Sequence, residues 1–309
     1  MTPQGCSSVF LCEQNEDVHT GQLFIALLFG VFVSVLIWYG HKWFSDTFQS
    51  NCSSKSCIRC HSTGTIHTNA LKRFHELEKS TSIDITVRIK LAVTNGGKQN
   101  LYKYPTQKPN ILYIPNLNTK GWLDSREYYL EDTKALRRGF QVISEEFETV
   151  FTIHRSNWIV NRVPSGQWSM FYFMNQGEWV KKNCQLCPKT VAILKSLKNF
   201  MDGSVFANSG FSVMMPHTEI DPHFGPTNAR LRCHLALKVT NKSTLCVDNE
   251  TRNWKTAKCL LFDDSFIHFA SHKGNYFDGP RAILMVDLWN PWLTLTERYI
   301  VQKCYSPTD

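Results

Sequence analysis

Residues 223–239 read HFGPTNARLRCHLALKV, a turn at Gly225-Pro226 followed by a regularly alternating run. Successive side chains of a β-strand point to opposite faces of a sheet, so the alternation predicts a strand with two different faces. One face carries Leu231, Cys233, Leu235, Leu237 and Val239, and the other carries Arg232, His234, Ala236 and Lys238. Because charged groups inside a protein are costly unless paired, the polar face predicts a pocket that holds an anion. The alternative is an edge strand whose polar face meets water.

Other short apolar or alternating runs follow the same pattern and are bounded by Gly, Pro or Asn. They predict strands at Trp168–Met174, Phe211–Met215, Cys259–Phe262 and Arg281–Trp289. Apolar residues at helical spacing predict helices at Asn69–Lys79 and over the stripe Leu136, Phe140, Ile143, Phe147 and Val150, which should pack against a sheet. Many short strands separated by turns predict a mainly β fold, a β-sandwich or jelly roll, with flanking helices.

The composition limits the class of protein. With 309 residues and 42% hydrophobic content, the chain can bury a large core, so disorder is not expected. The net charge of +8 comes from scattered Lys and Arg, without the basic helix or aromatic signature of nucleic-acid binding proteins. We therefore expect no nucleic-acid partner.

Residues 23–39 contain no charged and almost no polar residue. At about 1.5 Å per residue, they nearly cross a hydrocarbon core of roughly 30 Å. We expect a polar tail over residues 1–22, a single transmembrane helix over 23–39, a Cys-containing stalk with a helical segment over 40–108, and a globular domain over 109–303. A signal peptide is disfavoured because no Lys or Arg precedes the segment, and a buried core helix is the third reading.

The orientation of this segment stays open. The first Lys or Arg of the chain, Lys42, comes after this segment. The positive-inside rule therefore favours a cytosolic position for the C-terminal domain. Glycosylation sequons at Asn51, Asn241 and Asn249 would fit a glycoprotein in the lumen, but about three such motifs are expected by chance.

Two CxxC pairs, Cys57 with Cys60 and Cys184 with Cys187, stand out among the 11 Cys. In a lumenal protein they would form disulfides, whereas in a cytosolic protein four thiolates would suit tetrahedral zinc. A zinc-stabilised scaffold is therefore one alternative function. The other possibility for the cysteines is that they are structural and partly reduced.

His223, His268 and Arg281 are the candidates for chemistry. His223 precedes the turn before the alternating strand, and His268 follows the strand Cys259–Phe262 and an acidic turn. Two imidazoles on neighbouring strand ends can share a metal. Arg281 opens the last predicted strand, and its guanidinium can grip a carboxylate through two parallel hydrogen bonds. A buried salt bridge to Asp287 is the alternative for this arginine.

The motifs HFGPTN from His223, LRCHL from Leu231, LFDDSFIH ending at His268, and RAILMVDLWNP from Arg281 resemble the aspartyl/asparaginyl β-hydroxylase family. The resemblance spans roughly Pro109–Tyr299 and is nearest to the short, membrane-anchored members. It implies a double-stranded β-helix and a dioxygenase that uses Fe(II), 2-oxoglutarate and O2. The implied substrate is an Asp or Asn side chain of a protein, hydroxylated at the β-carbon.

The resemblance also implies roles for individual residues. His223 and His268 would bind iron, and Arg281 would hold the distal carboxylate of 2-oxoglutarate. Ser212, Arg232 and His234 match positions that line the co-substrate pocket. Gly225 stands where most such oxygenases carry an Asp or Glu ligand, which implies that water replaces the carboxylate.

Two further questions follow from the resemblance. His217-Thr218-Glu219 has the HxE spacing of the usual iron triad and competes with His223 on spacing alone. The family's substrates are EGF-like domains in the endoplasmic reticulum lumen, but this chain lacks the helical substrate-holding region of the long members. A membrane-anchored binding or regulatory protein with little turnover is therefore the alternative function.

Overall fold

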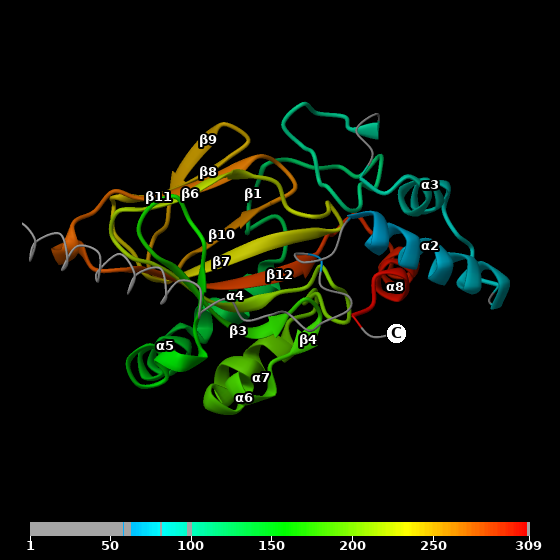
Figure 1. Ribbon diagram of the computed structural model, residues 1–309. Coiled ribbons are helices and arrows are strands. Elements are labelled where there is room, and N and C mark those ends of the chain that lie inside the picture. Colours follow the sequence, from blue (N-terminus) through cyan, green and yellow to red (C-terminus); the bar gives the residue numbers. More distant parts are fainter. Residues whose placement is uncertain (1–57, 59–62, 81, 98–100, 308–309) are drawn as a thin grey trace, which may run out of the picture. The chain divides into compact units, whose positions relative to one another are not determined.

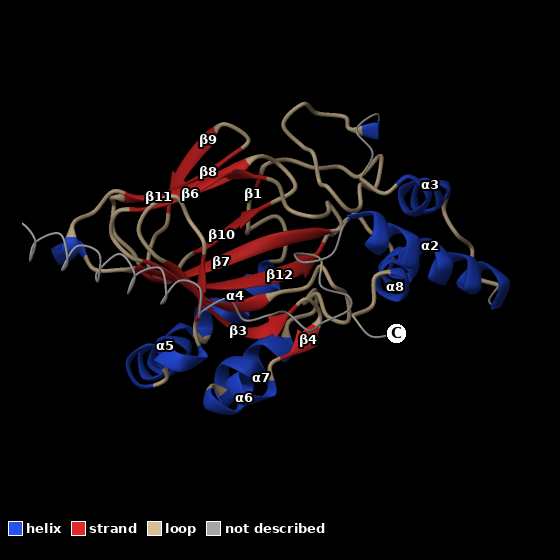
Figure 2. Cartoon of the chain, viewed as in Figure 1, coloured by secondary structure: helices blue, strands red, loops and turns tan. Residues whose placement is uncertain are grey.

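A computed structural model describes residue 58 and residues 63–80, 82–97 and 101–307 of the chain (Figure 1). These residues lie within one compact unit, Ser54–Asp309. Two antiparallel sheets form its centre, and helices flank them (Figure 2). The prediction of a mainly β fold with flanking helices is confirmed.

The larger sheet has the strand order β1-β10-β7-β12-β5-β3-β2, with β4 paired to β3. Its strands are β1 (Trp122–Leu123), β2 (Ile159–Asn161), β3 (Trp168–Asn175), β4 (Glu178–Trp179), β5 (Ser209–Met214), β7 (Arg230–Lys238), β10 (Cys259–Phe262) and β12 (Arg281–Trp289). The alternating run of the opening motif is β7, which pairs with β10 on one side and β12 on the other. The edge-strand alternative for this run is therefore wrong.

The smaller sheet has the order β6-β11-β8-β9. Its strands are β6 (Thr218–His223), β8 (Ser243–Val247), β9 (Glu250–Asn253) and β11 (His268–His272). The sequence did not predict them, because they mix polar and apolar residues without regular alternation. The sheets pack face to face, since one buried cluster joins side chains of the larger sheet to those of the smaller one: Met170, Met214 and Ile283, with Leu245, Val247 and Ala270.

Helices α4 (Leu130–Arg138), α5 (Phe140–Ile153), α6 (Lys181–Leu186) and α7 (Pro188–Ser196) lie against the other face of the larger sheet (Figure 1). Ile143, Phe147 and Val150 of α5 are buried in one cluster with Leu231 and Cys233 of β7. The predicted packing of this helix on a sheet is confirmed. Its predicted single stretch is wrong, because α4 ends and α5 begins around Gly139.

Three helices near the chain ends form a second layer with their own core. They are α2 (Thr63–Ser80), α3 (Val87–Asn95) and α8 (Leu295–Cys304), and their buried residues share one cluster. Arg88 of α3 is tied to Glu297 of α8 by an ion pair of 2.6 Å. The packed unit thus extends N-terminal of Pro109, where we expected the globular domain to begin. Among the described residues, the short 3-10 helices η2 (Arg155–Asn157) and η3 (Tyr276–Asp278) lie in connecting segments.

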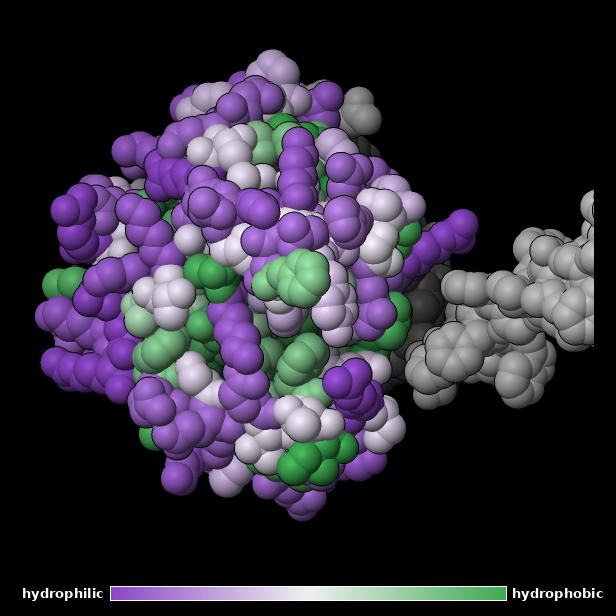
Figure 3. All heavy atoms as spheres, turned by 90° about the vertical axis from the view of Figure 1, so that its left-hand side faces the viewer, coloured by the Kyte–Doolittle hydropathy of each residue, from purple (hydrophilic) through white to green (hydrophobic). Residues whose placement is uncertain are grey.

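The membrane prediction falls on residues 23–39, which lie outside the described residues. Within the described part, no helix has the length and apolar character needed to cross a bilayer. The face of the molecule nearest η3 is mostly polar, with apolar residues in scattered groups (Figure 3). Such scattering is ordinary for a protein surface.

Candidate active site

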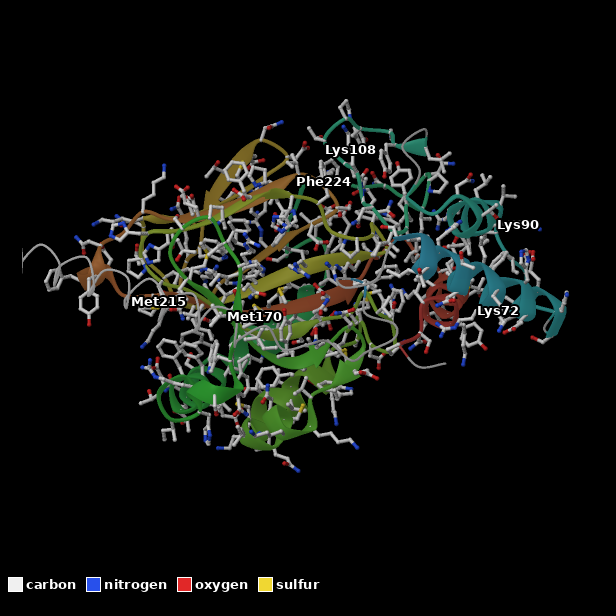
Figure 4. The ribbon with its side chains drawn as sticks, in the orientation of Figure 1. Lys72, Lys90, Lys108, Met170, Met215 and Phe224 are labelled. Carbon is white, nitrogen blue, oxygen red and sulfur yellow. The ribbon has the colours of Figure 1, made fainter. Side chains whose placement is uncertain are left out.

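Two imidazoles from neighbouring strands of the smaller sheet lie side by side. His223 ends β6 and His268 begins β11, and the antiparallel register sets them directly opposite each other. Their ring centroids are 4.1 Å apart. In Figure 4, Phe224, the neighbour of His223, lies on the upper side with the smaller sheet, and Met170 lies below on the larger sheet.

The hydrogen bonds of these rings fix where their protons lie. The Nδ1 atom of His223 is 2.8 Å from the carbonyl oxygen of Asp221, and that of His268 is 2.9 Å from the carbonyl oxygen of Phe266. A carbonyl oxygen only accepts, so each Nδ1 carries the proton and each Nε2 carries a lone pair. A histidine whose Nδ1–H is held in this way is the usual form of a metal ligand.

Both rings are also kept uncharged. Burial and the neighbouring His223 lower the pKa of His268 to about 3. Desolvation likewise lowers the pKa of His223. At neutral pH the two Nε2 atoms are therefore free bases that can donate to a metal ion.

Gly225 lies where a third protein ligand would be expected from the usual triad. A Cβ atom there would lie 2.6 Å from Cγ and 2.7 Å from both carboxylate oxygens of Asp264. The backbone N–H of Gly225 also donates to the carbonyl oxygen of Asp264 at 2.6 Å. The carboxylate of Asp264 thus fills the space that a side chain at this position would need. Across the described part of the chain, no group of three metal-ligating side chains occurs.

Four buried charges behind the imidazoles form a closed network. Arg230 pairs with Asp264 at 2.5 Å and with Asp287 at 3.0 Å. Arg232 pairs with the same two carboxylates, at 3.3 Å and 2.8 Å. Burial raises the pKa of Asp264, but the two guanidinium groups outweigh burial and hold it below its usual value. Two cations face two anions, so the network is electrically balanced.

Arg281 differs, because within the described residues it has no acidic partner. Its Nη1 donates to the backbone carbonyl and to the hydroxyl of Ser212, each at 3.3 Å, while its buried Nε has no partner. Burial lowers the pKa of Arg281 to about 9. The predicted alternative of a salt bridge to Asp287 is wrong, because Asp287 pairs with Arg230 and Arg232. A buried, unpaired guanidinium is suited to bind an anion.

Ser212 and His234, two of the predicted pocket residues, are connected to this guanidinium through tryptophans or directly. The indole N–H of Trp168 donates to the Ser212 hydroxyl at 3.0 Å. His234 is buried, and burial together with the nearby Arg232 holds its pKa well below the usual value. Its Nδ1 is 3.4 Å from the indole nitrogen of Trp254.

The structure also separates the competing histidine from the site. His217 precedes β6, and its backbone N–H donates to the carbonyl of His272, at the far end of β11 from His268. At about 3.3 Å per strand residue, this places His217 more than 10 Å along the strand from His268. His223, and not His217, is therefore opposite His268.

Sequence reasoning missed Trp254, Arg230 and the importance of Asp264. Arg230 and Asp264 lie within the quoted motifs, and Arg230 shares the strand face of Arg232 by simple alternation. Trp254 comes from the segment after β9 and reaches the pocket only through the packing of the two sheets. No local pattern in the sequence marks it.

Of the two CxxC pairs, Cys184 with Cys187 lies within the described residues. Cys184 and Cys187 are free thiols, and the Cys184 thiol donates to the carbonyl oxygen of Phe173 at 3.4 Å. Burial raises the pKa of both thiols, which favours the protonated form. Of the alternatives left open for this pair, a disulfide between Cys184 and Cys187 is not formed. The other pair, Cys57 with Cys60, lies outside the described residues.

The chain is similar to several known proteins. Residues 137–291 match the family model described as aspartyl/asparaginyl beta-hydroxylase. The chain is 38% identical to human aspartate beta-hydroxylase domain-containing protein 2 over 261 residues, which cover 83% of this chain and 70% of that protein. It is 34% identical to mouse aspartate beta-hydroxylase domain-containing protein 1 over 65% of this chain and 57% of that protein. Mouse aspartyl/asparaginyl beta-hydroxylase is 34% identical over 61% of this chain and 26% of its own length.

Proposed function

Because the chain belongs to the aspartyl/asparaginyl β-hydroxylase family, we propose that it is an Fe(II)- and 2-oxoglutarate-dependent dioxygenase of the double-stranded β-helix fold that hydroxylates an Asp or Asn side chain of a protein. The observation that carries the proposal is the pair of opposed, neutral imidazoles at His223 and His268. Their Nδ1 protons are held by carbonyl oxygens, so both Nε2 lone pairs are available to one metal ion.

The donor set is compatible with iron. Imidazole is a ligand of both iron and zinc, but zinc sites commonly use three or four protein ligands, and magnesium prefers oxygen. With two histidines as protein ligands, His223 and His268 would hold the ion and leave positions for co-substrate and water. Bound iron would supply the redox chemistry that couples O2 and the decarboxylation of 2-oxoglutarate to hydroxylation of a C–H bond.

The anion pocket supports the choice of co-substrate. Arg281 would bind the distal carboxylate of 2-oxoglutarate, with Ser212 beside it. Arg232 and His234 lie on the same face of β7 and would line the path between Arg281 and the imidazoles. The closed network of Arg230, Arg232, Asp264 and Asp287 keeps Arg232 fixed before any ligand binds, so little reorganisation of this side chain is needed.

Two measurements on the purified full chain test this function. We expect decarboxylation of 2-oxoglutarate that requires Fe(II) and stops in the Arg281→Met variant. Iron titration should fail for His223→Ala and remain normal for His217→Ala, the matched control from the residue just before β6. Normal iron binding by His223→Ala would refute the assignment.

A binding or regulatory protein that keeps the fold with little turnover is the second candidate. It is favoured by one observation, the space at Gly225 that is filled by Asp264 instead of a third ligand. Two protein ligands hold a metal ion less firmly than three. Iron and 2-oxoglutarate binding without decarboxylation, in the presence of every tested peptide, would favour this candidate.

We also propose that residues 23–39 anchor the chain in the endoplasmic reticulum membrane, with the domain in the lumen and EGF-like domains as substrates. The side chains at the sequons Asn241 and Asn249 are exposed and would be accessible to glycosylation there. Protection of the domain from protease in intact microsomes, and a mobility shift on removal of N-glycans, are the expected results. Digestion of the domain in intact vesicles would place it in the cytosol.

A further inference from the structure

Trp254 connects two residues of the anion pocket that lie on different strands. It follows β9 of the smaller sheet and is 3% exposed. The backbone just after it is held against β7, where the N–H of Ala257 donates to the carbonyl of Ala236 at 2.9 Å. The indole therefore has a fixed place between the two sheets.

The face of this indole lies against Arg281. The central carbon of the guanidinium is 4.8 Å from the centroid of the Trp254 ring, which is within the range of a cation–π interaction. Within the described residues, Arg281 has no acidic partner, and its Nε is unpaired. The ring face thus compensates the buried charge together with the two Ser212 oxygens when no anion is beside it.

The N–H of the same indole determines which ring nitrogen of His234 carries the proton. The two rings are close to coplanar, with an interplanar angle of 21°, and the indole nitrogen is 3.4 Å from Nδ1 of His234. An indole N–H can only donate, so Nδ1 of His234 must accept. The neutral imidazole then carries its proton on Nε2, which makes Nε2 a hydrogen-bond donor.

This tautomer is the opposite of that of His223 and His268. Those two rings carry the proton on Nδ1 and present a lone pair, as a metal ligand must. His234 presents an N–H, which suits an anionic oxygen and does not suit a metal ion. One protein thus holds three imidazoles in two different tautomers through different hydrogen-bond partners.

We propose that Trp254 is a positioning residue of the anion pocket, whose ring face holds the Arg281 guanidinium and whose N–H sets His234 as a donor for a carboxylate. This inference rests on the proposed co-substrate, a dicarboxylate held by Arg281. Trp254 itself does not touch the reacting atoms. It aligns the two donors that do contact the ligand.

Trp254→Phe and Trp254→Leu separate the two parts of the role. Phe keeps an aromatic face for Arg281 but has no N–H for His234, whereas Leu has neither. Trp158→Phe is the matched control, because Trp158 is also a buried tryptophan whose N–H donates, in this case to the carbonyl of Val150 in the core under α5.

Binding of N-oxalylglycine, a dicarboxylate analogue of 2-oxoglutarate, is measured on the full chain loaded with Mn(II). Oxalate, which lacks the distal carboxylate, is measured in parallel. A desolvated cation–π contact of about 2 kcal/mol corresponds to roughly thirtyfold in affinity. We expect N-oxalylglycine to bind roughly tenfold or more weakly to Trp254→Leu and by a smaller factor to Trp254→Phe, with oxalate and Mn(II) binding unchanged. An equal loss for oxalate, or no loss for N-oxalylglycine, would overturn the proposal.

The tautomer of His234 provides a readout that needs no ligand. Nitrogen-15 NMR of imidazole-labelled protein should show His234 protonated at Nε2 in the wild type and in Trp158→Phe, and a mixture of tautomers in Trp254→Phe. A wild-type His234 protonated at Nδ1 would refute the inference. Failure of the wild type to bind N-oxalylglycine at all, with the expected tautomer in place, would instead refute the proposed function.

Discussion

Placing a carboxylate at Gly225 is a direct way to test the geometry of the metal site. In the usual iron triad this position carries an acidic ligand, so Gly225→Asp would restore three protein ligands and tighten iron binding if the space were free. The structure predicts the opposite. A Cβ atom at Gly225 would lie 2.6 Å from Cγ of Asp264, whereas non-bonded carbon atoms are comfortable at about 3.5–4.0 Å.

The crowding cannot be relieved easily, because Asp264 is held in place. Arg230 and Arg232 pair with its carboxylate at 2.5 Å and 3.3 Å, and a hydrogen bond to a charged group contributes about 1.5–3 kcal/mol. Overpacking a well-filled interior costs about 1–3 kcal/mol, which we expect for Gly225→Ala. Gly225→Asp should cost more, since it also brings two carboxylates into contact.

Thermal unfolding and iron titration measure the two effects on the same samples. For a unit of this size, a loss of 1 kcal/mol lowers the melting temperature by about 2–4 °C. Gly139→Ala is the matched control, because the nearest atom that a new methyl group would meet is the end of the flexible Ile193 side chain. We expect a clear fall in melting temperature for both Gly225 variants, a small change for Gly139→Ala, and no gain in iron affinity for Gly225→Asp. A Gly225→Asp protein that melts normally and binds iron more tightly would refute the reasoning.

Three further substitutions test other parts of the structure. Asp287→Asn should lower the free energy of unfolding, measured in urea, by about 3–5 kcal/mol, because Arg230 and Arg232 lose a buried counter-charge. The control Asp124→Asn should cost little, because the ion pair of Asp124 with Arg126 is exposed. Burial raises the pKa of Asp263 to about 7, so the folded state holds a proton that the unfolded state releases, and stability should fall as the pH rises from about 4 to 7. Asp263→Asn should flatten that part of the stability–pH curve, and an unchanged slope would contradict the assignment. Phe147→Ala should cost about 3–5 kcal/mol in the same urea assay, because its ring is fully buried on α5, and a loss under 1 kcal/mol would show that the core refills the space.

The alternating run of β7 allowed a correct prediction of both its faces. Leu231 and Cys233 point into the core under α5, while Arg232 and His234 face the pocket. Alternation is a local property, so it can be read from a single strand. The partner of Arg232 cannot, because Asp287 reaches it from β12, more than fifty residues away in the chain.

The strands of the smaller sheet were not predicted, because they lack the local alternation that identified β7. β6 contains Glu219, Asp221 and Pro222 and is largely exposed along one edge, so it has no regular apolar face. The register that sets His223 against His268 belongs to the pairing of β6 with β11 and not to either sequence. The break at Gly139 was missed because α4 and α5 continue one apolar stripe across it.

The unpaired guanidinium of Arg281 has a consequence for the behaviour of the whole protein. The charges of Arg230, Arg232, Asp264 and Asp287 cancel, but within the described residues nothing encoded by the chain cancels Arg281. An anion from solution would therefore be a suitable counterion for Arg281. A small anion that binds only the folded state adds about 2.7 kcal/mol of stability at one hundred times its dissociation constant. The free energy of unfolding would then rise with the concentration of that anion, even when no substrate is being turned over.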